Sequence, residues 1–357
     1  MFAGNGRISD RQFYHLLVLD WFGKGALLIP SLAGTVTARE LILCLILGFL
    51  LAFLYVRMLC GISGKMNGDF PGYLRKSLGK WAEWAIALIF LLYAFFNLLF
   101  LARAFGEIGV LFVVPESGRE LLMVLLLAAG AAAAMGGLEV RARTASVLYP
   151  VLFWPMLALI LFSAFRMNPE YLQPGTAVLD RQGWSVTGRA FLAFGGAGVF
   201  LFPFPKVTGK SARAFQKGTL ATCAGLLALM LVIIGSYGEG GLKAMEWPSI
   251  RLMSSAELPG VFLQRWDVIF VGMLLMELFL TAGTSLYYLN LCGGRLWGHA
   301  GKGQIFLWCA LVFAAAYVCG SYERAVKLYT AVNGWTVTAA AALLVLLWLK
   351  GKGGRRR

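Results

Sequence analysis

The chain has 357 residues, of which 59% are hydrophobic and only 14% are charged, with a mean hydropathy of +0.75. A soluble domain carries about 25% charged residues, so this composition excludes a water-soluble enzyme and favours a protein that faces lipid. The formal net charge is +15, but the Lys and Arg residues lie in short connections and the tail. This distribution argues against a nucleic-acid-binding face.

Cysteine and histidine usage gives no sign of a metal or redox centre. The six cysteines show no CxxC spacing, and all but Cys292 lie inside apolar runs, where cysteine acts as a small buried hydrophobe. Only two histidines occur, and no nucleophile is paired with a base. We therefore predict no metal site, no cofactor and no enzymatic activity.

About ten apolar runs approach the length that crosses a bilayer, on the order of 20 residues. They lie at 12–34, 38–60, 82–105, 119–135, 145–165, 187–205, 218–238, 266–290, 304–320 and 333–350. The first resembles a signal peptide, but Asp20 and Lys24 interrupt it, so we interpret it as a retained helix. The sequence predicts an all-α polytopic membrane protein with a single transmembrane domain over 1–357.

Most of the 32 Lys and Arg residues fall on the side of the membrane that would hold both termini. Because cytoplasmic loops carry the excess of Lys and Arg, we predict that both termini are cytoplasmic. The terminal Arg355, Arg356 and Arg357 fit contact with anionic lipid headgroups, with a solvated stop-transfer tail as an equal alternative. Membrane lipids are therefore expected partners, and nucleic acid is not.

Two of the expected spans are interrupted in the same way. Residues 22–30 and 194–203 each read Phe-Gly, a second small residue, a short apolar run and then Pro, and they are five spans apart. Matching Gly- and Pro-broken segments are typical of a transporter's central site, while close helix packing by small residues is the alternative. An odd number of spans per repeat predicts two inverted repeats, at about 10–166 and 186–350. The expected ligand-binding positions in the breaks are Gly23, Lys24, Gly25, Gly195, Gly196 and Gly198.

Asp20 and Lys24 are four residues apart, with the acid first, which is the favourable order for a helical ion pair. In one interpretation the two charges only neutralise each other. In the other, Gly23 and Gly25 unwind the helix, and Lys24 meets a ligand carboxylate or replaces a coupling cation. Both interpretations stay open.

Further polar residues lie at membrane depth, where they are functional candidates by default. Glu277 lies near the middle of the eighth span with Thr281 one turn later. Burial favours its neutral form, so it could carry a proton; alternatively it pairs with Lys24 or hydrogen-bonds a neighbouring helix. Tyr93 and Asn97 share a face of the third span, where they could bind a ligand or pack. We assign Asp20, Glu277 and Thr281 to coupling, and expect Glu139 to form a salt bridge in a cytoplasmic turn.

Four stretches resemble the spore germination protein family, the B subunits of endospore germinant receptors in the amino acid–polyamine–organocation superfamily. They are ISDRQ at 8–12, GLEVRAR at 137–143 followed by Pro150, NPEYLQP at 168–174, and Trp247-Pro248 through FLQRWDVIF at 262–270. The resemblance implies a LeuT-like five-plus-five inverted repeat with helices 1 and 6 broken. It also implies residence in the spore inner membrane and assembly with an A subunit and a lipoprotein C subunit to sense a small-molecule germinant such as an amino acid. A proton-coupled amino-acid permease is the alternative.

Overall fold

The computed structural model describes residues 6–32, 35–63, 66, 68–172, 179–243, 245–254, 266–298 and 301–353. Its α-helices are α1 (Asp10–Leu28), α2 (Ala38–Ser63), α3 (Phe70–Leu78), α4 (Lys80–Phe112), α5 (Arg119–Met135), α6 (Gly137–Ser163), α7 (Arg181–Leu192), α8 (Ser211–Lys243), α9 (Pro248–Ser254), α10 (Trp266–Trp297), α11 (Lys302–Cys319) and α12 (Tyr322–Gly353). Short 3-10 helices are η1 (Pro30–Leu32), η2 (Ala164–Arg166), η3 (Pro169–Leu172), η4 (Gly195–Leu201) and η5 (Phe204–Lys206), and the strands are β1 (Ile8–Ser9) and β2 (Val207–Thr208). Arg355 to Arg357, residues 262–265 of the 262–270 motif and residues 173–174 of the 168–174 motif lie outside the described residues.

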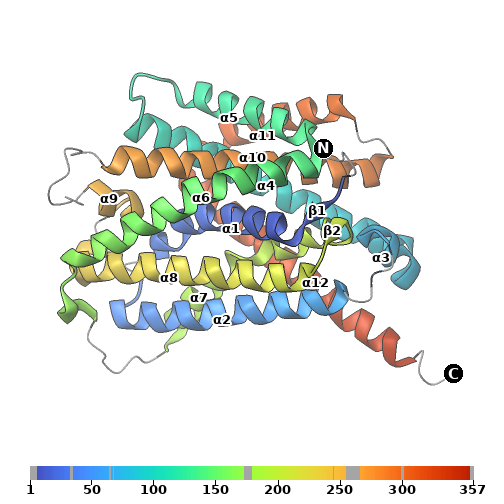
Figure 1. Cartoon of the computed structure of the whole chain (residues 1–357), viewed down its shortest axis with the longest axis horizontal. Coiled ribbons are helices and arrows are strands. Elements are labelled where there is room, and N and C mark those ends of the chain that lie inside the picture. Colours follow the sequence, from blue (N-terminus) through green and yellow to red (C-terminus); the bar gives the residue numbers. More distant parts are fainter. Residues whose placement is uncertain are drawn as a thin grey trace.

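All ten predicted spans coincide with helical segments that run roughly alongside one another (Figure 1). Seven of them, α2, α4, α6, α8, α10, α11 and α12, are long and apolar enough to cross a membrane by length and composition. The other three are marginal for different reasons. Helix α1 carries four charged residues, α5 has only 17 residues, and the sixth span is divided between α7 and η4. The protein is thus an all-α polytopic membrane protein in which ten is an approximate count.

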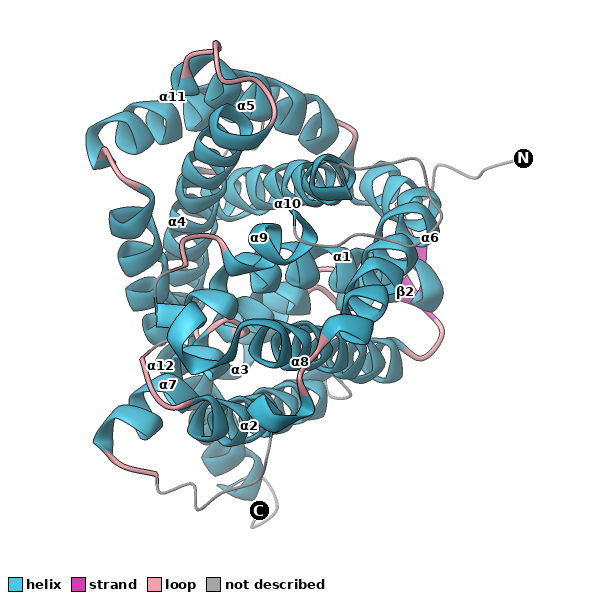
Figure 2. Ribbon diagram, turned by 90° about the vertical axis from the view of Figure 1, so that its left-hand side faces the viewer, coloured by secondary structure: helices cyan, strands magenta, loops and turns pink. Residues whose placement is uncertain are grey.

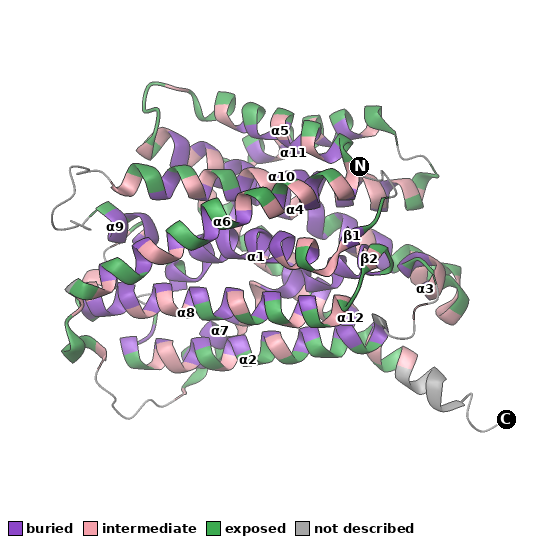
Figure 3. Cartoon of the chain, viewed as in Figure 1, coloured by how far each residue is buried: buried purple, intermediate pink, exposed green. Residues whose placement is uncertain are grey.

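Helix α1 lies at the centre of the bundle, in contact with α6, α8 and α10 (Figure 2). Ser9 begins it with a capping box, in which the Ser9 hydroxyl accepts the Gln12 N–H (3.1 Å) and the Gln12 side chain accepts the Ser9 N–H (2.9 Å). From there α1 is buried almost throughout (Figure 3). Aromatic rings fix it laterally, since Trp21 packs on Phe194 at 5.4 Å and on Phe215 at 5.7 Å between centroids. A helix too polar to face lipid is therefore enclosed by protein.

The prediction of an unwound backbone at Gly23–Gly25 is wrong. Helix α1 continues through both glycines to Leu28, and the Ile29 N–H still donates to the Gly25 carbonyl at 2.9 Å. A Cβ on Gly25 would overlap the Leu226 side chain, and one on Gly23 would lie 2.7 Å from a Glu277 oxygen. These glycines let α8 and α10 approach closely, which is the packing alternative.

The break in the sixth span is confirmed. Helix α7 ends at Leu192, and the backbone continues as the buried 3-10 helix η4 from Gly195 to Leu201. Irregular backbone survives at membrane depth only where protein satisfies its polar groups. Here the Gly195 carbonyl accepts hydrogen bonds from Thr336 (3.0 Å) and Tyr55 (3.4 Å). Side chains of α2 and α12 therefore replace the missing helical bonds.

A short parallel β-pair joins the two halves of the sequence. Ile8 pairs with Val207 and Ser9 with Thr208, and the Thr208 hydroxyl donates to the Ile8 carbonyl at 3.1 Å. Strand β1 leads directly into α1, and β2 precedes α8 by two residues. The pair fixes the beginnings of α1 and α8 next to each other at one end of the bundle (Figure 1).

Helix α12 begins at Tyr322, eleven residues before the predicted tenth span, because side chains of α4 cap it. Arg103 pairs with Glu107 at 2.8 Å and also donates to the Gly320 carbonyl. A Glu107 oxygen accepts the Tyr322 N–H at 3.1 Å, at the positive end of the new helix. The polar residues between the ninth and tenth predicted spans are thus the first turns of α12.

Helix α6 also begins earlier than predicted, at Gly137, whose φ of 74° suits glycine. Glu139 therefore lies in the first turn of a helix and not in a connecting turn. The expected salt bridge is present, between Glu139 and Arg143 one helical turn later. Arg141 is separate from this pair, because its side chain faces inward and is buried.

Candidate functional site

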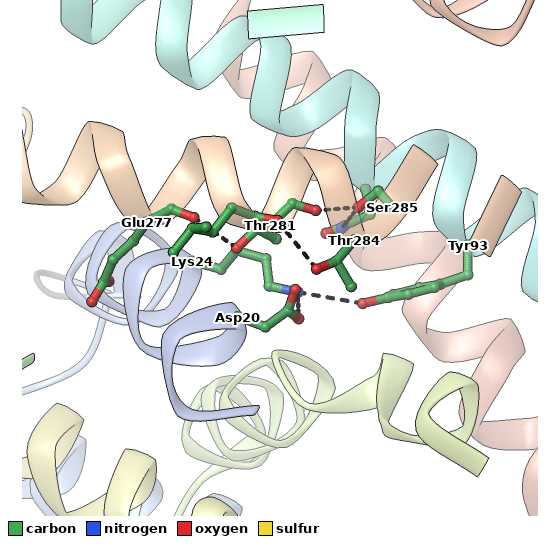
Figure 4. Close-up of polar contacts among 9 residues, drawn as sticks. Asp20, Lys24, Tyr93, Glu277, Thr281, Thr284 and Ser285 are labelled. Carbon is green, nitrogen blue, oxygen red and sulfur yellow. Dashed lines mark hydrogen bonds and ion pairs between the residues drawn. The ribbon is translucent and has the colours of Figure 1, made fainter. Parts of the chain in front are cut away.

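A buried ion pair lies at the centre of the bundle. The Lys24 ammonium donates to an Asp20 oxygen at 2.9 Å, and both side chains are almost wholly excluded from solvent. The pair exists because α1 stays helical, which places residues four apart on one face. The same ammonium donates to the Tyr93 hydroxyl of α4 at 3.4 Å (Figure 4). Helices α1 and α4 thus contribute three of the predicted site residues to one cluster.

Helix α10 adds a row of hydroxyl groups beside this cluster (Figure 4). Thr281 and Ser285 each donate to the carbonyl four residues earlier, at 2.9 Å. The Asn97 amide of α4 donates to the Ser285 hydroxyl at 2.6 Å. Asn97 therefore joins two helices, and its carbonyl oxygen is buried with no hydrogen-bond partner among the described residues.

Glu277 is fully buried on α10 and does not pair with Lys24. Its carboxyl lies against Gly23 of α1, and neither oxygen has a hydrogen-bond partner within the described part of the chain. An unpaired buried carboxylate would be very costly, so the neutral acid is the form that fits this position. Gly23 directly precedes Lys24, so the Glu277 carboxyl meets α1 one residue before the lysine of the ion pair.

The broken sixth span touches the cluster through its glycines. A Cβ on Gly196 would overlap the Tyr93 ring, and one on Gly195 would lie 2.9 Å from Asn333. Gly198 faces Phe90 in the same way, at 2.9 Å. The absence of side chains in η4 therefore allows Tyr93 to lie directly on the irregular backbone.

A small cavity of about 50 Å³ adjoins the cluster, between α1, α5, α6 and α10. Asp20 and Thr281 line it, together with Arg141, whose guanidinium lies 4.1 Å from the centre of the Tyr287 ring. The two terminal nitrogens of Arg141 and one oxygen of Asp20 have no hydrogen-bond partner among the described residues. The cavity is large enough for a few water molecules and has polar groups to hold them.

Several residues that complete the site were missed by the sequence analysis. Arg141 lies in the 137–143 motif, where the sequence predicts a turn. Tyr329 falls before the predicted tenth span, although its ring is 6.2 Å from that of Tyr93. Asn333 and Thr336 lie inside that span and contact Gly195. Polar residues one turn apart in an apolar run were the available signal for the last two.

The chain matches the family model described as spore germination protein over residues 7–324. It is 23% identical to spore germination protein YndE of Bacillus subtilis over 296 residues, which cover 82% of this chain and 81% of that protein. Spore germination protein B2 of the same organism is also 23% identical, over 73% of this chain and 72% of its own length.

Among solved structures, the chain resembles the crystal structure of MhsT in complex with L-phenylalanine. The TM-score is 0.66 at 15% identity, and the match covers 98% of this chain and 88% of that chain. This similarity shows the predicted LeuT-like fold with its inverted repeats, while the repeat boundaries at about 10–166 and 186–350 stay a prediction. From the extent of the family match, the chain belongs to the spore germination protein family.

Proposed function

We propose that this chain is the membrane-embedded B subunit of a spore germinant receptor, and that it binds a small germinant, an amino acid, beside the broken sixth span. The observation that carries the proposal is the buried cluster of Asp20, Lys24 and Tyr93, in which the tyrosine lies on Gly196. Charges and irregular backbone are costly at membrane depth and concentrate at binding sites there.

The charges of the cluster fit an amino acid in particular. Breaking the pair between Asp20 and Lys24 would leave two buried charges without partners, which is strongly unfavourable. A zwitterion avoids this cost, because its carboxylate can bind Lys24 while its ammonium binds Asp20. Tyr93 and the backbone at Gly195, Gly196 and Gly198 would complete the site, with Asn97 alongside.

Signalling then follows from a shift between two states. In the structure the ion pair is closed and Tyr93 covers Gly196. An occupied site requires the pair to open and Tyr93 to move from the glycine, so the germinant favours a second arrangement of α1, α4 and η4. We propose that an A subunit and a lipoprotein C subunit detect this change.

For localisation, we propose the spore inner membrane with both termini in the cytoplasm. This orientation predicts that a reporter active only in the cytoplasm signals when it is inserted within 206–217 or fused after Arg357, and is silent near Lys243. Fluorescence or enzymatic activity of each fusion, normalised to its abundance, measures the outcome. A signal near Lys243 with silence after Arg357 would contradict the orientation.

A proton-coupled amino-acid permease is the second candidate. It is favoured by the likeness to MhsT, which was solved with L-phenylalanine. It is also favoured by the buried Glu277 carboxyl, which has no hydrogen-bond partner among the described residues and so suits a group that carries a proton. In this mechanism Asp20 and Thr281 would belong to the coupling path beside the small cavity.

Two measurements, co-purification with partner subunits and amino-acid accumulation in proteoliposomes, separate the two candidates. As a receptor subunit, the chain should co-purify with A- and C-type subunits, and should bind a labelled amino acid without accumulating it in proteoliposomes. As a permease, it should accumulate the amino acid when a proton gradient is applied, and Glu277→Gln should abolish accumulation at unchanged abundance. Accumulation by the isolated chain with no partner subunits recovered would overturn the receptor proposal.

A further inference from the structure

A groove of about 650 Å³ opens at the beginnings of α1 and α8, away from the central cluster. It is lined by Asp10, Arg11, Tyr14, Lys210, Arg213, Ala214, Lys217, Leu220, Ala221 and Ala224. Helix α8 contributes most of these residues, and they recur every three or four positions, so they form one stripe along the helix. The stripe changes character along its length, from basic to apolar.

The basic half of the groove has an excess of positive charge. Arg11 of α1 lies in the lining together with Lys210, just before α8, and Arg213 and Lys217 in its first turns. Asp10 is the one acidic residue among the described residues that line the groove. All four cationic side chains are exposed, and none forms an ion pair with another described residue. The β-pair holds the beginnings of α1 and α8 together. The four like charges therefore repel one another and cannot move far apart. An anion bound between them would reduce this repulsion.

The apolar half of the groove lies farther along α8, inside a segment that is long and apolar enough to cross the membrane. Leu220 is 60% exposed, and Ala221 and Ala224 leave a shallow channel beside it. Small residues next to one exposed leucine leave room for an aliphatic chain. Tyr14 also lines the groove, and a 3.3 Å hydrogen bond joins its hydroxyl to that of Tyr149.

We propose that this groove binds an anionic phospholipid, with its phosphate among the four cations and an acyl chain along Leu220, Ala221 and Ala224. Basic pockets between helices at the cytoplasmic boundary are the kind of site that holds such headgroups. An acidic protein segment would satisfy the charges, but it would leave the apolar half of the groove without a matching partner. The lipid would bridge α1 and α8 and stabilise their joint.

The test uses the purified full-length chain and native mass spectrometry with vesicle lipids of defined composition, phosphatidylglycerol against phosphatidylcholine. One variant carries three substitutions in the groove, Lys210→Gln, Arg213→Gln and Lys217→Gln. It should retain phosphatidylglycerol at least tenfold less well than the wild type, since each surface cation contributes substantially to anionic lipid binding. Arg75→Gln/Lys76→Gln/Lys302→Gln removes three exposed cations elsewhere and is the matched control, with a change of about twofold or less expected.

A second variant fills the apolar half and keeps every charge. Ala221→Trp/Ala224→Trp should lose phosphatidylglycerol retention while folding is confirmed by an unchanged circular dichroism spectrum. Equal losses in the groove and control variants would overturn the proposal, because the lipid would then respond only to total charge. Stabilisation of the wild type by inorganic phosphate alone, or by an acidic peptide that also binds the double-tryptophan variant, would overturn it as well. None of these readouts involves the germinant, so the result is independent of the proposed function.

Discussion

Gly196→Ala is expected to reduce the germinant response at least tenfold while the protein remains in the membrane. A Cβ at this position would overlap the Tyr93 ring, so the tyrosine has to leave the place where it meets Lys24. Overpacking of this kind costs about 1–3 kcal/mol in a packed interior. The measurement is the rate of germination of spores that carry the variant, normalised to its abundance in the membrane fraction.

Gly188→Ala is the matched control for this substitution. Gly188 lies on α7 in the same span, and a Cβ there would meet no atom within 4 Å. Since alanine favours helix by up to about 1 kcal/mol over glycine, this variant should keep both abundance and response. If Gly196→Ala spores germinated normally at normal abundance, the broken segment would serve packing alone.

Removing the charge of Lys24 is expected to have the other large effect. Lys24→Met leaves Asp20 as a buried charge without a partner, and Asp20→Asn does the same to Lys24; losing one partner of a buried pair costs about 3–5 kcal/mol. Asp20→Asn/Lys24→Met removes both charges, so its thermal stability should return toward that of the wild type. The thermal midpoints of the four proteins form a double-mutant cycle that measures the coupling.

The germinant response of the same four proteins separates neutralisation from ligand binding. If the amino acid replaces the pair, the double variant should be stable and yet respond at least tenfold more weakly than the wild type. Recovery of the response together with stability would remove Lys24 and Asp20 from the ligand site. The backbone at η4 would then be the remaining candidate.

The sequence predicts the helices well, because lipid imposes a length and a composition on each of them. All ten predicted spans are helical segments, and the break in the sixth is where the glycines and Pro203 placed it. The boundaries of α6 and α12 were less predictable. Gly137 and the cap formed by Arg103 and Glu107 allow polar residues to continue those helices.

The site was predictable only in part, because pairs within one helix follow from spacing whereas pairs between helices do not. The ion pair of Asp20 and Lys24 followed from their separation of four residues. The same two-glycine pattern predicted an unwound α1, but the side chains that fill the space beside Gly23 and Gly25 belong to α8 and α10. Whether a glycine interrupts a helix or allows another helix to pack closely against it therefore depends on how helices far apart in the sequence cross.

The separation of Asp20 and Lys24 has a consequence for how the protein is made. During synthesis α1 precedes α6, α8 and α10, which later bury it. Each unpaired charge would oppose entry into the bilayer by roughly 2.5–3.5 kcal/mol at the centre of a helix. Because the two residues pair within α1, the nascent helix neutralises itself before its neighbours exist. The β-pair that fixes the beginning of α1 can form only after Val207 and Thr208 have been translated. We therefore expect α1 to enter the membrane with its ion pair formed and β1 still unpaired, and to take its final position when β2 pairs with β1.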